Sequence, residues 1–405
     1  MDEKAVASQT STDVAGASPP MRVPVLDLVR YFLRLGALGF GGPAALCAQM
    51  ERELVGERRW LTPKEMREAI AVSQSLPGPL AIQVGIFAGY MRGGMAGALA
   101  GGWAFILPNF VIVALLGALY VHFGDLPWMT GVFYGVAPVV IALIVHSSWR
   151  LAKMGMEDRL QWGIAAAAFL ITVVLKAEVA LVFAGAGLLG VLWYGTLLRR
   201  KPQAVSGVVA LPAAAGAPHA ASASVIGKLI LFFLKAGSLT FGSGLVIVPF
   251  LEKGLVQENG WLSPRDFLIA VAVGMLSPGP VVITATFVGF VVAGFWGSLA
   301  STVAIFTPSF AFILVAAPLM RRYRENPNVQ GFIKGAYGAA IGTILGAAVL
   351  LGKIAIGDAL TALVALAALV LLFRIKIPNP ALIAAAAVIG LIAYPLVKPA
   401  WVMLR

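Results

Sequence analysis

A Pro-Gly-Pro sequence interrupts an apolar stretch of this chain at two places. The first is Pro77-Gly78-Pro79 and the second is Pro278-Gly279-Pro280. Proline removes a backbone donor and clashes with the preceding turn, so each sequence ends one helix and begins another. In lipid, such a break is tolerated only where the freed backbone groups face protein or a polar cavity. A broken helix that recurs in both halves of a chain is typical of a transporter's substrate site.

The composition indicates a membrane protein. Of the 405 residues, 60% are hydrophobic and 12% are charged, whereas charged residues usually make up about 25% of a soluble domain. Five apolar runs have lengths suited to crossing a hydrocarbon core as helices, some with help from their flanks. They are residues 94–120, 131–145, 179–198, 298–320 and 359–373. No alternating strand pattern suggests a barrel, so we predict an all-α polytopic membrane protein.

The charge pattern fits the same class. The formal net charge is +12, and the basic residues form short clusters between apolar spans, which is the positive-inside pattern rather than that of a nucleic-acid-binding protein. Residues 1–21 lack the layout of a signal peptide and are predicted to be a disordered tail. The single cysteine, Cys47, excludes a disulfide within the chain. No spacing of His, Cys or carboxylate side chains predicts a metal or cofactor site.

The second half of the sequence repeats the first. Phe40-Gly41-Gly42-Pro43 matches Phe241-Gly242-Ser243-Gly244 at a spacing of 201 residues, the same spacing that separates the two Pro-Gly-Pro sequences. Further pairs at this spacing are Glu51 with Glu252 and Trp60-Leu61-Thr62-Pro63 with Trp261-Leu262-Ser263-Pro264. Pairs at a spacing of 200 residues are Phe87 with Phe287, Gly89 with Gly289, Pro108 with Pro308, Gly131 with Gly331 and Gly135 with Gly335. We predict two homologous transmembrane repeats, residues 22–198 and 225–405, joined by a linker at 199–224.

Two topologies are compatible with this repeat. Each half is predicted to hold a first helix with the glycine motif, an amphipathic charged segment, the broken segment and four more apolar helices. If the broken segment is a re-entrant hairpin, the basic loops at 52–67, 150–159 and 199–201 fall on one side, the cytoplasm. The halves are then inverted, each has five spanning helices plus the Pro-Gly-Pro hairpin, and the 252–266 loop faces out. If the segment crosses once, the halves are parallel with six spans each. We favour the inverted arrangement.

The breaks supply donors for an anion. Amides at half-helix N-termini donate without placing a full charge in lipid. Glycines let the backbone approach a ligand, and nearby polar side chains add donors. The predicted substrate-binding residues here are Gly41, Gly42, Ser73, Gln74, Ser75, Gly78, Gln83, Gly242, Ser243, Gly244, Ser277, Gly279 and Thr284, with Pro77, Pro79, Pro278 and Pro280 as the helix breaks. For any single glycine the alternative is close helix packing.

Charged and polar residues near the glycine motifs are further candidates. Arg34 and Lys235 are repeat partners on apolar helices, and cations at depth are expensive and tend to be functional. The alternative is that their long side chains reach the interface. Gln49 is a further candidate for substrate binding. Glu51 and Glu252 are candidates for gating or proton coupling, and the alternative for them is a solvated position at a helix end.

The linked motifs resemble those of the chromate ion transporter family. Three motifs of the first half resemble the N-terminal half of that family. They are Phe40-Gly41-Gly42-Pro43 with Gln49 and Glu51, Trp60-Leu61-Thr62, and Gln74-Ser75-Leu76-Pro77-Gly78-Pro79. Four motifs of the second half resemble the family's C-terminal half. They are Phe241-Gly242-Ser243-Gly244 through Pro249 and Glu252, Gly260-Trp261-Leu262, Ser277-Pro278-Gly279-Pro280, and Ala285-Thr286-Phe287-Val288-Gly289. The resemblance spans most of the chain in the long, two-domain form. It implies export of chromate across the bacterial inner membrane, resistance to chromate, and competition by sulfate. One position departs from the family's pattern, because Gln74 pairs with Met275 where a glutamine is expected.

Electrical energy indicates the direction of transport. Moving one charge through about 100 mV is worth about 2.3 kcal/mol, so a dianion that leaves a negative cytoplasm releases about 4.6 kcal/mol. We therefore predict potential-assisted export. The alternatives are import or exchange of sulfate or another oxyanion, and a membrane-embedded enzyme, for which three histidines and one cysteine offer no catalytic cluster. The expected partners are the anion and the lipid bilayer, and the sequence leaves open whether the chain forms a homo-oligomer.

Overall fold

The computed structural model describes residues 22–39, 42–123, 126–175, 179–195, 224–242, 244–316, 326–375 and 377–397. The first half contains α1 (Val25–Leu38), α2 (Gly42–Met50), η1 (Glu51–Glu57), α3 (Pro63–Ser75), β1 (Gly78–Pro79), α4 (Leu80–Phe123), α5 (Pro127–Gly155), α6 (Arg159–Leu170), η2 (Ile171–Leu175) and α7 (Val179–Tyr194). The second half contains α8 (Val225–Ser238), β2 (Phe241–Gly242), η4 (Gly244–Ile247), α9 (Val248–Glu252), η5 (Lys253–Glu258), α10 (Pro264–Leu276), η6 (Val281–Ile283), α11 (Thr284–Ala311), η7 (Phe312–Ala316), α13 (Pro327–Ala355), α14 (Ala359–Arg374) and α15 (Asn379–Val397). The linker and the N-terminal tail lie outside the described residues, apart from Ser224.

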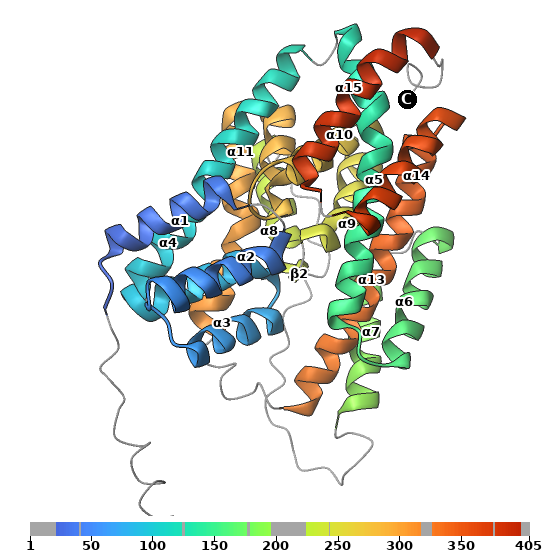
Figure 1. The fold of residues 1–405 in the computed structure, drawn as a ribbon. Helices are drawn as coiled ribbons and strands as arrows, with labels where there is room; N and C mark the ends of the chain where they lie inside the picture. Colours follow the sequence, from blue (N-terminus) through green and yellow to red (C-terminus); the bar gives the residue numbers. More distant parts are fainter. Residues whose placement is uncertain are drawn as a thin grey trace, which may run out of the picture.

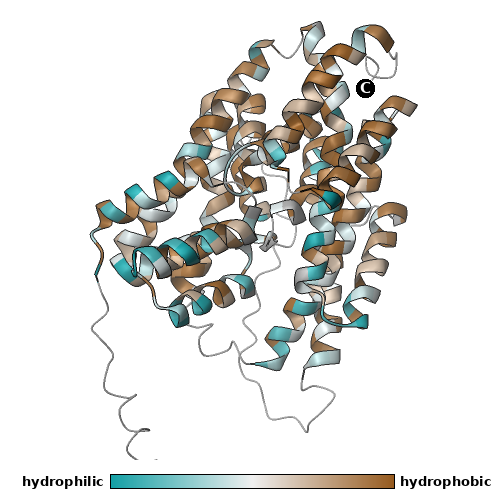
Figure 2. Ribbon diagram, viewed as in Figure 1, coloured by the Kyte–Doolittle hydropathy of each residue, from teal (hydrophilic) through white to brown (hydrophobic). Residues whose placement is uncertain are grey.

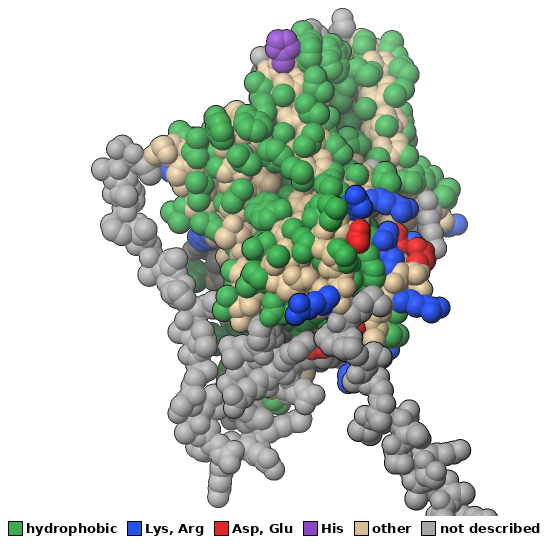
Figure 3. Space-filling model, turned by 90° about the vertical axis from the view of Figure 1, so that its left-hand side faces the viewer, with side chains coloured by type: hydrophobic (Ala, Val, Ile, Leu, Met, Phe, Trp, Pro, Cys, Tyr) green, Lys and Arg blue, Asp and Glu red, His purple; other side chains and the backbone are tan. Residues whose placement is uncertain are grey.

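The helices have the lengths and surfaces of membrane spans. Five segments are long and apolar enough to cross a bilayer, namely Leu80–Phe123, Trp128–Lys153, Val281–Val315, Pro327–Ala355 and Asn379–Val397. Shorter apolar helices cover Arg159–Val174, Leu181–Tyr194 and Ala359–Arg374. Hydrophobic residues line most of these helices in Figure 2, and in the face shown in Figure 3 apolar side chains cover most of the surface. The predicted all-α polytopic fold is confirmed.

One long helix of each half, α4 and α11, is folded back on itself. In α4, Gly94 has φ of 61° and ψ of −150°, a conformation that favours glycine. The inner arm of α4, residues 80–93, then packs against its outer arm, residues 95–123, and Gly89 and Gly97 meet so closely that a Cβ on Gly89 would lie 2.5 Å from the Gly97 carbonyl oxygen. In α11 the same reversal occurs at Gly294, with φ of 61°.

Each half begins with two re-entrant helical hairpins. The Val23 amide donates to the Arg92 carbonyl, and the Arg92 side chain donates to the Trp60 carbonyl. The start of α1, the end of η1 and the end of the inner arm therefore meet at one end of the molecule. The Pro-Gly-Pro segment forms the predicted hairpin between α3 and the inner arm. The structure adds a second hairpin, because the predicted first helix is itself broken between Leu38 and Gly42.

An ion pair between buried Arg92 and half-buried Glu65 joins the ends of the Pro-Gly-Pro hairpin. Arg92 is 6% exposed, and its guanidinium donates to Glu65, which also caps α3 with Thr62. We expect Glu65→Gln to lower the apparent Tm by at least about 5 °C, because removing one partner leaves a buried charge poorly compensated. The matched control is Lys334→Gln, which breaks an exposed pair with Glu157 and should change little. Thermal unfolding in detergent measures both, and equal Tm values for the two variants would contradict this role of Arg92.

The two halves run in opposite directions. The repeat partners α5 and α13 are antiparallel. Gly155 at the end of α5 contacts Tyr337 in the first half of α13, whereas Gly352 near the end of α13 faces Ile141 in the middle of α5. The outer arm of α4 and the corresponding part of α11 are antiparallel as well. The Trp103 and Phe310 rings stack at 5.1 Å, and farther along these helices the Phe110 and Phe295 rings meet at 6.1 Å. The inverted arrangement predicted from the basic loops is the one that the fold has.

The halves also exchange packing partners. Helix α5 packs against α14 and α15 of the second half, and α13 packs against α6 and α7 of the first. Small residues allow these contacts, since a Cβ on Gly135 would lie 2.0 Å from the Ala386 carbonyl oxygen and one on Gly335 would lie 2.0 Å from that of Ala186. Helices α5, α6, α7, α13, α14 and α15 form one flank in Figure 1, and α1, α2, α3 and part of α4 form the other.

The molecule has a basic end and an opposite end, and the outer arm of α4 and helix α5 run between them. The outer arm of α4 and the whole of α5 each have 29 residues, about 43 Å at 1.5 Å per residue. The outer arm leaves the end where Trp60 and Arg92 meet, and α5 returns to it. We call this the basic end, because it carries Arg52, Arg58, Arg59, Lys64, Arg67, Arg150, Lys153 and Arg159. The start of α10 lies at the opposite end, beside Tyr120 and Thr130.

Candidate functional site

Each Pro-Gly-Pro break pairs with the glycine motif of the other half. Strand β1 pairs in parallel with β2, with Gly78 opposite Phe241 and Pro79 opposite Gly242, and the Gly78 amide donates to the Thr240 carbonyl at 2.5 Å. The Gly279 amide donates to the Gly39 carbonyl at 2.8 Å. We name these contacts the first junction and the second junction, after the half that supplies the Pro-Gly-Pro sequence.

Helix ends gather at the two junctions. Helices α1, α3, α8 and α10 end near them, and α2, the inner arm of α4, η4 and η6 begin there. The first amides of a helix have no partner within it and carry the positive end of the helix dipole. The junctions therefore bring donors that suit an anion into the interior. Among the described residues, Arg92 is the one charged side chain that is buried.

The two central glycines allow a close approach between halves. Gly78 has φ of 138°, and a Cβ there would lie 2.3 Å from Gln83 Nε2 and 2.7 Å from Ser309 Oγ. Gly279 has φ of 91°, and a Cβ there would lie 2.5 Å from Asn109 Nδ2. Any side chain at either position would collide with the polar group of a neighbouring helix. The backbone of each break thus faces a polar side chain that comes from the other half.

Asn109 and Ser309 are site residues that sequence reasoning missed. They are repeat partners at a spacing of 200 residues, each directly follows a helix proline, and each lies against the Pro-Gly-Pro sequence of the other half. Both are fully buried. The signal that could have found them is a polar residue after Pro108 and again after Pro308, inside runs that are otherwise apolar.

The junctions differ in how far their polar side chains are satisfied. At the first, Gln83 Nε2 donates to the Pro77 carbonyl at 2.5 Å, while Ser73 Oγ, Gln83 Oε1 and Ser309 Oγ are buried without a hydrogen-bond partner among the described residues. At the second, Ser277 donates to the Gly274 carbonyl at 3.1 Å and Thr284 to the Val281 carbonyl at 2.8 Å.

At the second junction, the side-chain amide of Asn109 is only partly satisfied by hydrogen bonds. Its Nδ2 donates to the Gly36 and Phe105 carbonyls at 3.2 and 3.3 Å. Its Oδ1 has no partner among the described residues. Buried polar atoms are normally paired, so the larger unpaired set at the first junction indicates a place that a polar ligand can complete.

The remaining residues predicted to bind substrate lie on several different elements. Gly242 forms β2, and Gly244 approaches the other break, where a Cβ would lie 2.8 Å from the Val282 amide nitrogen. Gln74 is exposed on α3, and Gly42 begins α2. Gly41, Ser243 and the side chain of Ser75 lie outside the described residues.

The charged candidates lie on exposed or half-buried faces. Arg34 and Lys235 are exposed, and the Lys235 ammonium lies 5.5 Å from the centre of the Phe250 ring. Gln49 donates to Glu53 at 2.9 Å. Glu51 is exposed, and the Glu252 carboxylate accepts from Gln257 at 2.9 Å.

The two breaks differ in exposure. At the first, Gln74 is exposed and Pro77 is partly exposed. At the second, the residues from Ser277 to Pro280 are all buried. The first break is therefore the nearer of the two to the surface.

Helix α10, which leads to the second break, is held against neighbouring helices at the opposite end. Helix α10 packs against α5 and α15, the Tyr120 hydroxyl donates to Asp266 at 2.5 Å, and Arg265 donates to Thr130 at 3.3 Å. Its repeat partner α3 packs against α4, η1 and β2. The surroundings of α3 leave Lys64, Arg67 and Gln74 exposed, whereas no residue of α10 is exposed.

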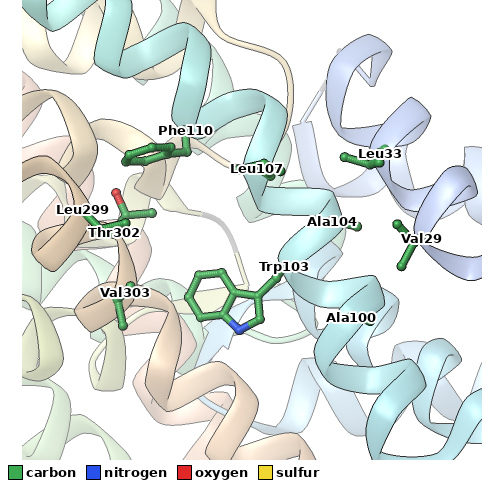
Figure 4. Close-up of a pocket in the computed structure, with 10 residues that line it drawn as sticks. All are labelled: Val29, Leu33, Ala100, Trp103, Ala104, Leu107, Phe110, Leu299, Thr302 and Val303. Carbon is green, nitrogen blue, oxygen red and sulfur yellow. The ribbon is translucent and has the colours of Figure 1, made fainter. Parts of the chain in front are cut away.

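Two clefts on the apolar surface do not suit an anion. One, of about 370 Å³, lies between α1, α4 and α11, and Figure 4 shows the Trp103 ring at its centre, with Val303 on α11 across from it and Leu33 on α1 beyond α4. The other, of about 540 Å³, lies between α8 and α11 and shares Leu299 and Val303 with the first. A dianion would lose its hydration there and gain few donors in return.

The inverted halves and the paired breaks define a polytopic membrane protein of the inverted-repeat class. A family model described as chromate transporter matches residues 26–191 and 227–391. Since these matches cover most of both halves, the chain belongs to the chromate transporter family.

Curated relatives agree over most of their length. A chromate transport protein of Cupriavidus metallidurans is 44% identical over 374 residues, which cover 91% of this chain and 93% of the relative. A probable chromate transport protein of Synechococcus elongatus is 40% identical, with 90% and 95% covered. A chromate transport protein of Pseudomonas aeruginosa is 33% identical, with 83% and 82% covered. No solved structure matches the chain.

Proposed function

We propose that this protein exports chromate from the bacterial cytoplasm across the inner membrane and so confers resistance, with sulfate as a competing anion. The junctions of broken helices carry the proposal, because they place helix N-termini and buried hydroxyl groups where the two halves meet. The family and the names of the relatives supply the substrate. The proposed gating or coupling residues are Glu51 and Glu252.

The basic end is the proposed cytoplasmic end, following the positive-inside rule. Chromate would enter from that end, where the first break is nearer the surface, and leave after α10 separates from α5 and α15. The membrane potential assists this direction, since export of negative charge from a negative compartment releases energy. The tight packing of α10 and the exposure of α3 support entry from the basic end.

Efflux from loaded proteoliposomes tests the proposed function. With chromate inside and the basic end facing the lumen, we expect a potential of about 100 mV, negative inside, to speed efflux, because up to about 4.6 kcal/mol becomes available per dianion. Reversing the potential should slow it. Empty liposomes and liposomes with added sulfate are the controls. Efflux that is indifferent to voltage would contradict potential-assisted export, and sulfate uptake without chromate efflux would point to a sulfate importer.

A further inference from the structure

The two junctions share an equivalent backbone hydrogen bond, from Gly78 to Thr240 and from Gly279 to Gly39, but their side chains differ in chemistry. At the first, three buried side chains, Ser73, Gln83 and Ser309, keep an oxygen without a partner among the described residues. At the second, Ser277 and Thr284 are bonded to their own backbone, and Asn109 donates to two carbonyl groups, which leaves its Oδ1, an acceptor, as the one oxygen of these three side chains without a partner among the described residues. A junction whose hydroxyl groups are already satisfied has little to offer a ligand.

The first junction also combines donors from both halves. The inner arm of α4 begins at Leu80, so its first amides have no intrahelical partner. Ser309 comes from the second half, and its hydroxyl lies beside Gly78, where a Cβ would be 2.7 Å away. Ser73 lies in the last turn of α3, directly before the break, and is 0% exposed. These groups donate without a buried positive charge.

Gln83 contributes an acceptor to the same place. Its Nε2 donates to the Pro77 carbonyl at 2.5 Å, which fixes the orientation of the amide, since the flipped form would set two oxygens against each other. The Oε1 atom is therefore an acceptor among donors. It repels a fully ionised oxyanion and accepts a hydrogen bond from one that carries a proton. Chromate takes up a proton near neutral pH, whereas sulfate stays fully ionised.

We propose that the first junction is the single oxyanion site of the chain, that Ser73 and Ser309 donate to the anion, and that Gln83 favours an oxyanion that carries a proton over one that is fully ionised. Sulfate then competes only weakly, and each singly charged anion gains from the membrane potential half the free energy that a dianion gains. This rests on the proposed function for the identity of the substrate, and not for the place or the number of sites. The second junction then acts as a structural contact. The site is incomplete without Ser309, so neither half binds the anion alone.

The stoichiometry and the donors are tested by chromate binding to the purified full chain in detergent. We expect one chromate per chain, and a loss of affinity of about tenfold or more in Ser309→Ala, since a hydrogen bond to a charged ligand is removed. The matched control is Thr284→Val at the second junction, where the hydroxyl is bonded to its own backbone; it should bind within about twofold of the parent chain. Two chromates per chain, or equal losses in both variants, would overturn the proposal.

The role of Gln83 as an acceptor is tested by measuring how chromate affinity depends on pH. We expect chromate affinity of the unaltered chain to fall from about pH 6 to about pH 8, and Gln83→Leu to lose this dependence and to bind sulfate more tightly relative to chromate. Charged groups on the surrounding elements are Asp27, Arg30 and Arg34 on α1, Arg92 on the inner arm, Lys64, Glu65, Arg67 and Glu68 on α3, and Lys228 and Lys235 on α8, while α11 has none. Groups of these types do not ordinarily titrate in that interval.

The nearest histidine along the chain, His122, lies in the last turn of the outer arm, 39 residues beyond Gln83. A pH-independent affinity in the unaltered chain would overturn the role of Gln83, and this measurement needs no variant to fold. If the chain binds sulfate but not chromate, and Ser309→Ala weakens that binding, the substrate of the proposed function fails while the site stands. If Ser309→Ala transports and binds chromate normally, the site fails while the function stands.

Discussion

Gly78→Ala is expected to reduce chromate efflux by about a hundredfold or more. The new Cβ would lie 2.3 Å from Gln83 Nε2 and 2.7 Å from Ser309 Oγ. The backbone φ of 138° at this position is also one that residues with a side chain rarely adopt. The break, or the Gln83 and Ser309 side chains that it meets, must then shift, and displacements of about 1 Å at a binding site can cost about a hundredfold in rate. Efflux from proteoliposomes that contain equal amounts of folded protein measures the loss.

A matched glycine provides the control. Gly163 in α6 has open space where its Cβ would lie, with no heavy atom within 4 Å, so Gly163→Ala should transport like the parent chain. The apparent Tm of both variants separates a loss of function from a loss of fold. Normal efflux by Gly78→Ala would show that the close approach of the two halves is not needed for transport.

A cysteine at position 74 is expected to react with a water-soluble maleimide at least about tenfold faster than one at position 275. The two positions are repeat partners in the 201-residue register, but Gln74 is exposed whereas Met275 is 5% exposed. A buried thiol must wait for a local opening before it reacts. Gln74→Cys and Met275→Cys are compared in a Cys47→Ser background, and the rate of labelling in inside-out vesicles is measured.

The side of labelling matters as much as its rate. Inside-out vesicles expose the cytoplasmic face, so Gln74→Cys should react there and should be protected in right-side-out vesicles. The Cys47→Ser parent shows the background. Faster labelling of Met275→Cys would mean that the second break, and not the first, is open to water. Labelling of Gln74→Cys from outside would reverse the proposed orientation of the basic end.

Local signals in the sequence predicted much of the fold. Proline and glycine mark the breaks because they act on the backbone within one turn, so the hairpin at Pro77-Gly78-Pro79 was predicted where it occurs. The repeat spacing paired the elements of the two halves, and the basic loops predicted their inversion. These signals concern short segments or net charge and do not depend on how distant segments pack.

Contacts between distant segments were not predicted. Nothing in the apolar pattern says that the break at Gly78 pairs with Phe241 of the other half, because such pairings depend on the packing of whole helices. Asn109 and Ser309 were missed for a related reason: the 200-residue spacing pairs them, but their residue types differ and only the packing of distant helices places each against the Pro-Gly-Pro sequence of the other half. The break between Leu38 and Gly42 went unrecognised because the glycine motif was read as a feature of one continuous helix.

The opposed directions of α5 and α13 have a consequence for biogenesis. Two segments of one ancestry fold to the same shape, so the shape cannot tell the insertion machinery which way up each should enter the bilayer. That information must reside in the connecting loops, where the 52–67 segment holds five lysine or arginine residues and the 252–266 segment holds two. Adding lysines to the second of these loops should misdirect that half during synthesis and leave every cross-half contact unmade, even though no residue of the transport route has changed.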